Sequence, residues 1–389
     1  MSGGPAVAFT AEELAARVAR TRSAMRERGL AALCVAGPEN VYYLLGLNHQ
    51  GYFAFTLLLL PLEGEPLLVT RAMERPTVEA QAPGCVHVPF GDGEDPAAAA
   101  ARAVRKAAAP GDRVGVERAS MYLPVAVWER LRASLDGLDW ADGSGIVDAV
   151  RAVKSPAEIA CMRRAAAISD QAMQAAVAAG GAGVSDRQVA AAVYHRLLQA
   201  GSDHPGIVPL IRPREVLLQE HLTGPHDRLL AAGDELLVEL SASVGRYHAP
   251  LSRMLYLGRV PAGAERVAEV ALGAQEAVRA ALRPGAVTGE VYAAWQRAVD
   301  QGLGHPRYRR HNCGYLVGIG FQPSWVGGGV PVGIRDGSDL VVAEGMTFHV
   351  LSWLLGQGPA DYVVSDTILV TPAGGELLTT TPRHPLVVP

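Results

Sequence analysis

The order of helical and strand-like segments is the feature that most constrains how this chain can fold. Before residue 153, helical patterns such as 10–29 and 96–109 alternate with short apolar segments. Alternation of this kind is typical of a three-layer α/β domain. After residue 153, two helices, a block of strands, two more helices and a second block of strands follow one another. This order predicts a duplicated α+β unit, and we therefore expect two domains, 1–153 and 154–389.

Local signals indicate where several of these elements begin. Thr10 is followed three residues later by Glu13, and Ser155 is followed three residues later by Glu158. This spacing is that of a capping box, in which two residues satisfy each other's backbone N–H groups at the start of a helix. Residues 40–47 (NVYYLLGL) are apolar and aromatic instead, and we expect them to form a strand.

Composition and charge narrow the classes of function. The chain has 389 residues, of which 49% are hydrophobic and 19% charged, as in a globular protein large enough for two cores. With a net charge of −4, the chain lacks the basic surface that binds nucleic acid or an anionic membrane. We interpret the short basic run Arg309-Arg310-His311 as a local feature at the rim of a site. The longest apolar stretch, residues 53–61, is too short to span a bilayer.

The N-terminus and the cysteines indicate a cellular compartment. The first residues lack the basic and then apolar pattern of a signal peptide. The four cysteines are far apart and include no Cys-x-x-Cys pair, which argues against a zinc site and against a disulfide framework. They are Cys34, Cys85, Cys161 and Cys313. We expect a reduced, cytoplasmic protein that binds neither nucleic acid nor a membrane.

Several segments together resemble the creatinase/prolidase/aminopeptidase P superfamily. VRAVKSPAEIACMRR is similar to the linker before that family's catalytic domain, and NVYYLLGL to a strand and turn of its N-terminal domain. GDELLVELSAS with RYHAPLSRM resembles the first β-ribbon, GYLVGIGFQPSW the central histidine-bearing turn, and EGMTFHVLSWLL with VVSDTILVTPAG the last two strands. The resemblance implies an α+β pita-bread catalytic domain preceded by a three-layer α/β creatinase-type N-terminal domain.

The metal-binding positions of that superfamily are occupied by different residue types in this chain. The metallopeptidases hold two metal ions with two Asp, one His and two Glu. By resemblance, the corresponding positions are Glu239, Pro250, Tyr315, Leu351 and Ser365. Proline, leucine and tyrosine cannot replace carboxylate and imidazole donors, so we predict no dinuclear metal site and no cofactor. A site for a single metal ion, formed by Glu239, His248 and His349, stays open as an alternative.

Two branches of the superfamily, creatinase and ectoine hydrolase, work without a metal. RYHAPLSR, GYLVGIGFQPSW, EGMTFHVL and EHLTGP resemble the ectoine hydrolase forms of these segments. There are also departures, because that branch's Asp-Trp-Gly-Glu is Ser324-Trp325-Val326-Gly327 here, and a carboxylate expected on the penultimate strand is absent near Val363. The missing acids put ectoine itself in doubt and leave open another small substrate with a C–N bond.

His221 and Glu239 are the candidate catalytic residues. By resemblance, His221 aligns with the catalytic histidine of creatinase, and a loop histidine with a near-neutral pKa suits proton transfer. The alternative for His221 is a surface histidine bonded to backbone. Glu239 lies in the middle of an apolar strand, where an unpaired carboxylate is costly. It is expected either to contact a cationic substrate group or to form a structural salt bridge with Arg253 or another base.

A second group of residues is expected to bind substrate. His349 lies in an apolar strand, where a satisfied core histidine is the alternative. Tyr315 could orient substrate or fill the space that the metal left. Tyr247 and His248 are neighbours on one strand, so at most one of them can face a pocket. The full set is His349, Tyr315, Tyr247, His248, the aromatic pair Phe321 and Trp325, and His49.

Residues outside this set are candidates for anion binding, for nucleophilic catalysis and for a role in a dimer. Arg212, Arg214 and Arg335 could bind a substrate carboxylate, with solvated loop charges as the alternative. Cys313 would need a lowered pKa and a paired histidine to act as a nucleophile. His49 belongs to a loop that, in related dimers, reaches the neighbouring subunit's pocket, and we therefore expect a homodimer.

The residues and the resemblance together predict a metal-independent hydrolase. Its substrate would be a small polar amidine, cyclic amidine or amide, with His221 as general acid and base and Glu239 as the group that binds the substrate cation. Three alternatives stay open: a creatinase-type amidinohydrolase, a metallopeptidase, and a protein of the same fold that binds small molecules or partners without catalysis.

Overall fold

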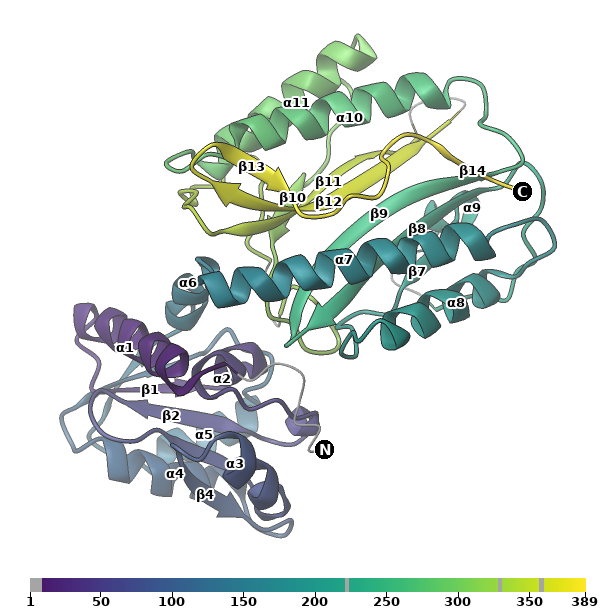
Figure 1. Ribbon diagram of the computed structural model, residues 1–389. Coiled ribbons are helices and arrows are strands. Elements are labelled where there is room, and N and C mark those ends of the chain that lie inside the picture. Colours follow the sequence, from purple (N-terminus) through teal and green to yellow (C-terminus); the bar gives the residue numbers. More distant parts are fainter. Residues whose placement is uncertain (1–8, 221–223, 328–330, 357–359) are drawn as a thin grey trace. The chain divides into compact units, whose positions relative to one another are not determined.

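The computed structural model describes residues 9–220, 224–327, 331–356 and 360–389. The chain forms two compact units (Figure 1). The first comprises Met1–Arg151 with Gly327–Val330, and the second comprises Ala152–Val326 with Pro331–Pro389. Within the ranges that the structure describes, no helix is both long and apolar enough to cross a membrane.

A six-stranded mixed sheet forms the centre of the first unit. Its strand order is β4-β3-β2-β1-β5-β6, and β1 is antiparallel to β2 and parallel to β5. Helix α4 packs against β2 and β3, while α1 packs against α2 in another layer. The strands are β1 (Ala32–Val35), β2 (Leu57–Pro61), β3 (Leu67–Arg71), β4 (Val86–Phe90), β5 (Arg113–Val116) and β6 (Asp139–Asp142). The helices are α1 (Ala11–Glu27), α2 (Pro38–Leu45), α3 (Arg75–Gln81), α4 (Pro96–Ala107), α5 (Val125–Ala133) and α6 (Ile146–Ala152), with 3₁₀ turns η1 (Gly51–Phe53) and η2 (Ala72–Glu74).

The segment expected to form a strand at 40–47 lies largely in helix α2. Pro38 stands in the first turn of this helix, and Gly46 ends it in the left-handed conformation with φ 72°. Proline is preset for the first helical turn, and glycine adopts the conformation of the C-terminal cap without strain. Every residue of α2 is buried, so its apolar run reflects a buried helix. The strand prediction is wrong here, because a short apolar run does not by itself distinguish a buried helix from a strand.

The second unit is built on an eight-stranded sheet. The main order is β10-β11-β12-β9-β8-β7, with β13 paired to β12 and β14 paired to β9. Strands β8 and β9 form a long hairpin whose two turn residues, Gly245 and Arg246, both have positive φ. Such a turn matches the natural twist of paired strands. The strands are β7 (Leu210–Pro213), β8 (Glu235–Val244), β9 (Tyr247–Leu257), β10 (Gly314–Leu316), β11 (Thr347–Leu354), β12 (Tyr362–Thr371), β13 (Gly374–Leu377) and β14 (Leu386–Val388).

Two helix pairs pack along different parts of this curved sheet (Figure 1). Helix α7 contacts β8 and β9 and pairs with α8, whereas α10 contacts β11 and β12 and pairs with α11. The capping box predicted at Ser155 and Glu158 is present at the start of α7. The predicted order of helix pair, strands, helix pair and strands is confirmed. The helices are α7 (Pro156–Ala179), α8 (Asp186–Gln199), α9 (Arg214–Leu217), α10 (Ala264–Ala281) and α11 (Thr288–Leu303).

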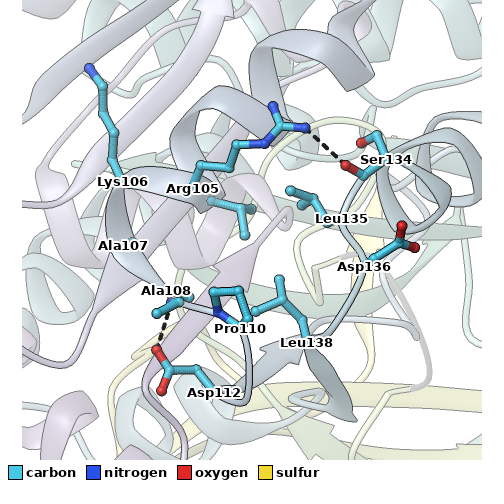
Figure 2. A pocket seen from close by; sticks show the side chains of 12 residues that line it. Arg105, Lys106, Ala107, Ala108, Pro110, Asp112, Ser134, Leu135, Asp136 and Leu138 are labelled. Atoms are coloured by element: carbon cyan, nitrogen blue, oxygen red, sulfur yellow. Dashed lines mark hydrogen bonds between the residues drawn. The ribbon is translucent and has the colours of Figure 1, made fainter.

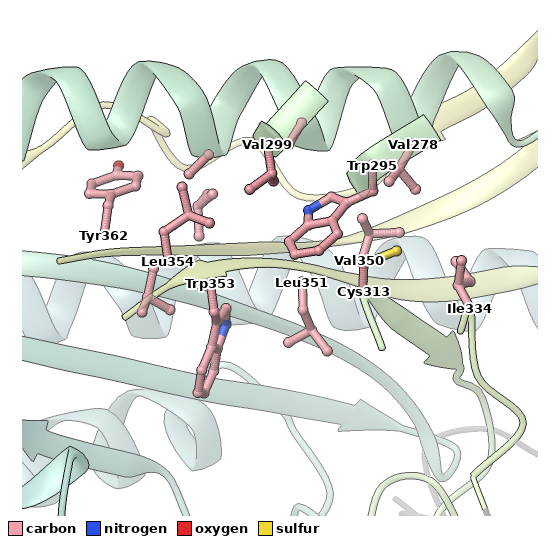
Figure 3. Close-up of a cluster of buried hydrophobic side chains, with 14 of the residues drawn as sticks. Val278, Trp295, Val299, Cys313, Ile334, Val350, Leu351, Trp353, Leu354 and Tyr362 are labelled. Atoms are coloured by element: carbon pink, nitrogen blue, oxygen red, sulfur yellow. The ribbon is translucent and has the colours of Figure 1, made fainter. Parts of the chain in front are cut away.

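Side chains along β11 alternate between the helix-covered face of the sheet and the opposite face. In Figure 3, Leu354 lies on the side of Trp295 and Val299 from helix α11, whereas Leu351 and Trp353 point away from the helices. This alternation follows from the two-residue repeat of a strand. His349 has the same parity as Leu351 and Trp353 and therefore shares the face that they occupy. That face carries the candidate site.

Candidate active site

A cavity of about 470 Å³ lies on the face of the second unit's sheet that the helices leave uncovered. A cavity of this volume suits a small molecule. Strands β7, β8, β10 and β11 contribute to its wall, together with the loops on either side of β10. The lining residues are Ile207, Leu210, Leu217, Glu239, Arg310, His311, Asn312, Tyr315, Ser324, Trp325, Val326, Pro331, Leu351, Trp353 and Leu355.

Glu239 is the acidic residue of this cavity. It lies in the middle of β8, opposite Leu210 on β7 and Ser252 on β9, and only 5% of its surface is exposed. Burial raises the pKa of its carboxyl group to about 7, although the nearby Arg310 guanidinium lowers this pKa. Near neutral pH the carboxyl group therefore lies close to its titration midpoint. A cationic ligand would favour the ionised form.

A hydrogen-bonded network lies beside Glu239 and reaches the cavity through Tyr315 and Trp325. The Trp325 indole N–H donates to the Tyr315 hydroxyl over 3.0 Å, and this hydroxyl bonds His349 Nδ1 over 2.8 Å. On the other side of the ring, His349 Nε2 bonds the Ser365 hydroxyl over 2.6 Å, and Ser252 donates to the same hydroxyl over 2.7 Å. These bonds occupy both ring nitrogens and hold the imidazole in one orientation.

Burial and a nearby positive charge keep His349 in its neutral form. Burial lowers the pKa of His349 to about 3, and the Arg310 charge lowers it further. Its Nε2 lies 3.9 Å from Glu239 Oε1, but a neutral imidazole cannot form an ion pair with that carboxylate. Burial and the Glu239 charge also raise the pKa of Tyr315, so its hydroxyl stays protonated. The site therefore places one titratable carboxyl group beside neutral hydrogen-bonding groups and the Arg310 charge.

The donor set does not fit the two-metal site of the metallopeptidases. Among the five positions that correspond by resemblance, Leu351 is directly paired with Ser365, and Ser252 is paired with both Ser365 and Glu239. Strand pairing thus brings Glu239, Leu351 and Ser365 together, but two of them carry leucine and serine where carboxylates would be needed. In the part of the chain that the structure describes, no group of three or more His, Cys, Asp or Glu side chains could hold a metal ion.

Arg310, Asn312 and Trp353 are lining residues that the sequence did not single out for the site. The Arg310 guanidinium lies over the Trp353 ring, 4.7 Å from its centre. Three atoms of this group are buried and have no hydrogen-bond partner among the described residues: Arg310 Nε, Asn312 Oδ1 and Trp353 Nε1. The alternation of β11 could have indicated Trp353, two residues beyond Leu351. Nothing in the sequence indicates that Arg310 reaches the cavity.

Of the predicted substrate-binding residues, only Tyr315 and Trp325 line the cavity; His349 lies behind it beside Glu239, and three others lie elsewhere in the second unit. The Tyr247 hydroxyl donates to Glu158 on α7 over 2.6 Å. His248 Nε2 accepts from the Gly206 backbone N–H over 2.8 Å, and its pKa falls to about 4, mainly through burial. Phe321 lies under the Arg246 guanidinium at 4.5 Å. The structure therefore brings Glu239, Tyr315, Trp325 and His349 together, and it places these three elsewhere in the second unit.

His221 lies outside the described residues, and His49 belongs to the first unit. His49 Nδ1 accepts from the Gly51 backbone N–H over 3.1 Å, and the His49 ring packs against Tyr52. Of the positions where acids are missing, Ser324 lines the cavity, Gly327 is grouped with the first unit, and Val363 belongs to the hydrophobic core.

The candidate arginines and the candidate cysteine do not line this cavity. Arg212 is buried in β7, and Arg214 forms an ion pair with Asp361 at 2.7 Å. Arg335 is exposed and does not line the cavity. Cys313 is fully buried in the core, where burial raises the pKa of its thiol and disfavours the nucleophilic thiolate.

A larger depression, of about 660 Å³, lies on the first unit between the ends of α4 and α5 (Figure 2). Arg105 donates to the Ser134 carbonyl there over 2.9 Å, and Asp112 accepts from the Ala109 backbone N–H over 2.8 Å. None of its lining residues has a buried polar side-chain atom without a partner. It therefore lacks the unsatisfied groups that distinguish the cavity of the second unit.

Two family models match this chain in the order of its two units. Residues 160–372 match metallopeptidase family M24, and residues 17–153 match the creatinase/prolidase N-terminal domain. The chain therefore belongs to metallopeptidase family M24, in the creatinase/prolidase/aminopeptidase P superfamily. The resemblance predicted from the sequence is confirmed, and so is the pita-bread fold with a creatinase-type domain before it.

Individual relatives match the chain along nearly its whole length. An uncharacterized hydrolase/peptidase, y4tM, of Sinorhizobium fredii is 30% identical, over 97% of this chain and 98% of the relative. The ectoine hydrolase of Halomonas elongata is 28% identical, over 97% of each chain. The crystal structure of dipeptidase PepE from Mycobacterium ulcerans superimposes with a TM-score of 0.83 at 24% identity, over 98% of this chain and 100% of that one. These relatives support a hydrolase, and the PepE likeness shows the fold.

Proposed function

We propose that the protein hydrolyses a C–N bond in a small polar amidine, cyclic amidine or amide without a metal ion. The observation that carries the proposal is the buried carboxyl group of Glu239 in the cavity. By the resemblance to the metallopeptidases, Glu239 occupies a metal position, and the other ligand positions carry Pro250, Tyr315, Leu351 and Ser365. A cationic substrate group would bring to this carboxylate the positive charge that a metal ion brings in the metallopeptidases. The similarity to ectoine hydrolase supports the same class of reaction.

Glu239 would bind the substrate and polarise it. An amidinium or guanidinium group beside the carboxylate places its N–H donors on the acidic oxygens and keeps the positive charge on the C–N group. The central carbon is then more electrophilic toward water. The neutral His349 would hold the Tyr315 hydroxyl over 2.8 Å, and this hydroxyl would orient the substrate and stabilise the charge that develops during attack.

His221 would transfer the protons of the reaction. In this mechanism it takes a proton from the attacking water, the new C–O bond forms, and the same proton passes to the nitrogen that leaves when the C–N bond breaks. This role rests on the resemblance to the catalytic histidine of creatinase. A homodimer in which His49 approaches the cavity of the neighbouring subunit also stays a proposal, and the mass of the protein in solution tests it.

A turnover screen tests the proposed reaction. The panel contains ectoine, hydroxyectoine, creatine and related amidines, and the products are measured by mass spectrometry. We expect His221→Ala to lower turnover of the substrate found by about 100- to 10,000-fold. His226→Ala is the matched control, because His226 lies a few residues further along and forms an exposed pair with Glu220. Near-normal turnover by His221→Ala would refute the mechanism.

A metal-dependent dipeptidase is the second candidate, because the family model is that of a metallopeptidase. The donor set on β8, β9, β11 and β12 argues against it. Hydrolysis of dipeptides that requires an added divalent ion would favour this candidate over ours. Binding of amidines without any turnover would instead indicate a non-catalytic binding protein.

A further inference from the structure

An apolar groove of about 500 Å³ lies on the first unit, and all of its lining residues belong to that unit. Helix α1, the end of α2, the turn between β2 and β3, and the segment from α3 to β4 form it. Most of the lining side chains are apolar, among them Leu14, Val18, Leu44, Leu45 and Pro66. A groove of this size and composition is typical of a site for a small, largely apolar molecule.

Alanines on helix α1 leave the groove open to a ligand. Ala11, Ala15 and Ala19 follow one another at intervals of four residues, so they share one face of the helix with Leu14 and Val18. All three alanines are exposed. A methyl group at these positions leaves space in the groove that a large side chain would fill. Substitutions on this face can therefore test whether the groove is occupied.

Arg22 brings a positive charge without an acidic partner to the groove. Its Nε donates to the Pro61 carbonyl over 3.0 Å, and its Nη2 donates to the Gly64 carbonyl. No acidic side chain of the described residues forms an ion pair with it. Its Nη1 forms no hydrogen bond with a described residue and, unlike the enclosed unsatisfied atoms of the protein, is accessible. This nitrogen can therefore donate to an acceptor on a ligand.

The other charged residues that line the groove, Arg26 and Glu63, neutralise each other. Arg26 Nη2 lies 2.7 Å from Glu63 Oε1, and both side chains are exposed. Partial burial lowers the pKa of Arg22, although the Glu63 charge raises it. The charge of Arg22 is thus only partly compensated. An anionic group in the groove would stabilise it through charge-assisted hydrogen bonds.

We propose that this groove binds a free monocarboxylate with an unbranched apolar tail, that is, a medium-chain fatty acid. Its carboxylate accepts from Arg22 Nη1, and its tail lies along Leu14, Val18 and the end of α2. A neutral apolar molecule would leave the Arg22 charge uncompensated, and a small polar anion would leave the apolar wall exposed to water. The inference does not depend on the proposed function, because the groove shares no residue with the lining of the candidate active site.

Calorimetric titrations of matched acids and alcohols into the full chain test the site. The probes are octanoate, decanoate, 1-octanol and 1-decanol, at pH 8 and below the concentrations at which they aggregate. Octanoate should bind about 10-fold more tightly than 1-octanol, because its carboxylate forms charge-assisted hydrogen bonds. Decanoate should bind roughly 10-fold more tightly than octanoate, because each buried methylene adds about a factor of four.

Variants of α1 and its C-terminal end locate the site. Arg22→Gln should remove the preference for the acids, whereas Arg28→Gln, at an exposed arginine that does not line the groove, should leave it unchanged. Ala15→Trp should abolish binding of all four probes, because the indole fills the groove. Ala16→Trp is its matched control, at an exposed alanine of the same helix outside the groove. Circular dichroism shows whether each variant is folded.

Equal affinities for octanoate and 1-octanol, or binding that survives in a folded Ala15→Trp protein, would overturn the proposal. A wild-type chain that binds no probe would overturn it as well. If such a chain formed a dimer that Ala15→Trp dissociates, the groove would be an interface with a second copy. If it bound only anionic phospholipid vesicles, the groove would be a membrane contact. None of these measurements requires hydrolysis, so each result is independent of the proposed function.

Discussion

Two sets of charged residues in the second unit, Arg253 with Asp366 and Arg310 with Glu239, differ in how far the protein satisfies their charges. Arg253 and Asp366 are fully buried and form an ion pair at 2.7 Å. The Arg253 guanidinium also donates to four backbone carbonyls, and Asp366 accepts from Gln275 and Thr379. Glu239 and Arg310 lie on the cavity face, without an ion pair between them. We call Arg253 and Asp366 the closed pair, because other protein groups satisfy both charges. We call Glu239 and Arg310 the open pair, because no ion pair joins them and a ligand could contact both.

This difference indicates which buried charges maintain the fold and which serve binding. From the sequence, a structural salt bridge between Glu239 and Arg253 is one alternative. In the structure, Arg253 forms its ion pair with Asp366 instead. A buried charge whose hydrogen bonds are complete contributes to a unique fold. A buried charge without a partner costs stability, and such a cost is characteristic of functional sites. We therefore expect that neutralising Asp366 lowers the stability of the protein, whereas neutralising Glu239 raises it.

Neutralising the closed pair should have the largest effect on stability. Asp366→Asn keeps the side-chain shape but leaves the Arg253 charge buried without a counter-charge. We expect a loss of about 3–5 kcal/mol in the free energy of unfolding, measured with urea. A loss smaller than about 1 kcal/mol, as for an exposed ion pair, would show that Arg253 and Asp366 do not form a buried ion pair that stabilises the fold.

Neutralising Glu239 should change stability in the opposite direction. The pKa of its carboxyl group is about 7 in the folded chain and near 4.5 in the unfolded chain, so the folded state binds more protons between these values. Wild-type stability from this group is full below pH 4.5 and is lost as pH rises to 7 and beyond. At pH 8, Glu239→Gln should be more stable than wild type by at most roughly 3 kcal/mol, and this gain should vanish near pH 4.5.

Thermal or urea unfolding at a series of pH values measures the stability difference between Glu239→Gln and wild type and so checks its sign. Glu344→Gln, at an exposed carboxylate before β11, is the control and should change the free energy of unfolding by less than about 0.5 kcal/mol. The same Glu239 variant should lose turnover of a cationic substrate, because it can no longer neutralise the bound charge. A Glu239→Gln protein that is less stable than wild type at pH 8 would contradict the unpaired, buried state of this group.

Breaking the neutral network beside the open pair should cost less than breaking the closed pair. Tyr315→Phe removes the hydroxyl that accepts from Trp325 and bonds His349. Two buried polar atoms then lose a partner, and we expect destabilisation of about 1–3 kcal/mol together with a lower kcat. Tyr194→Phe on α8, a half-buried tyrosine outside the network, should have little effect on either quantity. An unchanged kcat for Tyr315→Phe would remove Tyr315 from the proposed site.

The smallest effect is expected on the core side of the sheet. Cys313 follows the cavity residue Asn312 but packs in the core among residues such as Ile334 (Figure 3). Cys313→Ala should cost roughly 1 kcal/mol of stability and leave kcat near the wild-type value. Abolished turnover in a variant that is still folded would restore the cysteine nucleophile as an explanation of the chemistry.

The sequence predicts the structure best where a residue type at a position has a single physical explanation. The capping box at Ser155 predicts the start of α7, and a lone acid in an apolar strand indicates that Glu239 needs a partner. The residue types at Leu351 and Ser365 are enough to show that carboxylate ligands are missing there. Each of these inferences depends on local chemistry or on one aligned position.

The remainder depends on contacts between distant segments. Residues 40–47 carry no periodicity that separates a buried helix from a strand, and their position in the core decides the outcome. The sequence indicates only a rim residue at Arg310, because its contact with Trp353 arises from the packing of a loop against β11. Tyr247 and His248 lie on an expected strand, but their partners, Glu158 and the Gly206 backbone, are far away in sequence.

Turnover by protein of known metal content tests the central claim most directly. The purified chain is assayed on the substrate found in the screen, before and after dialysis against a chelator, and its metals are quantified by mass spectrometry. We predict far fewer than one metal ion per chain and an unchanged kcat/KM after chelation. Stoichiometric manganese, zinc or cobalt, with activity that chelation removes and added metal restores, would contradict the account.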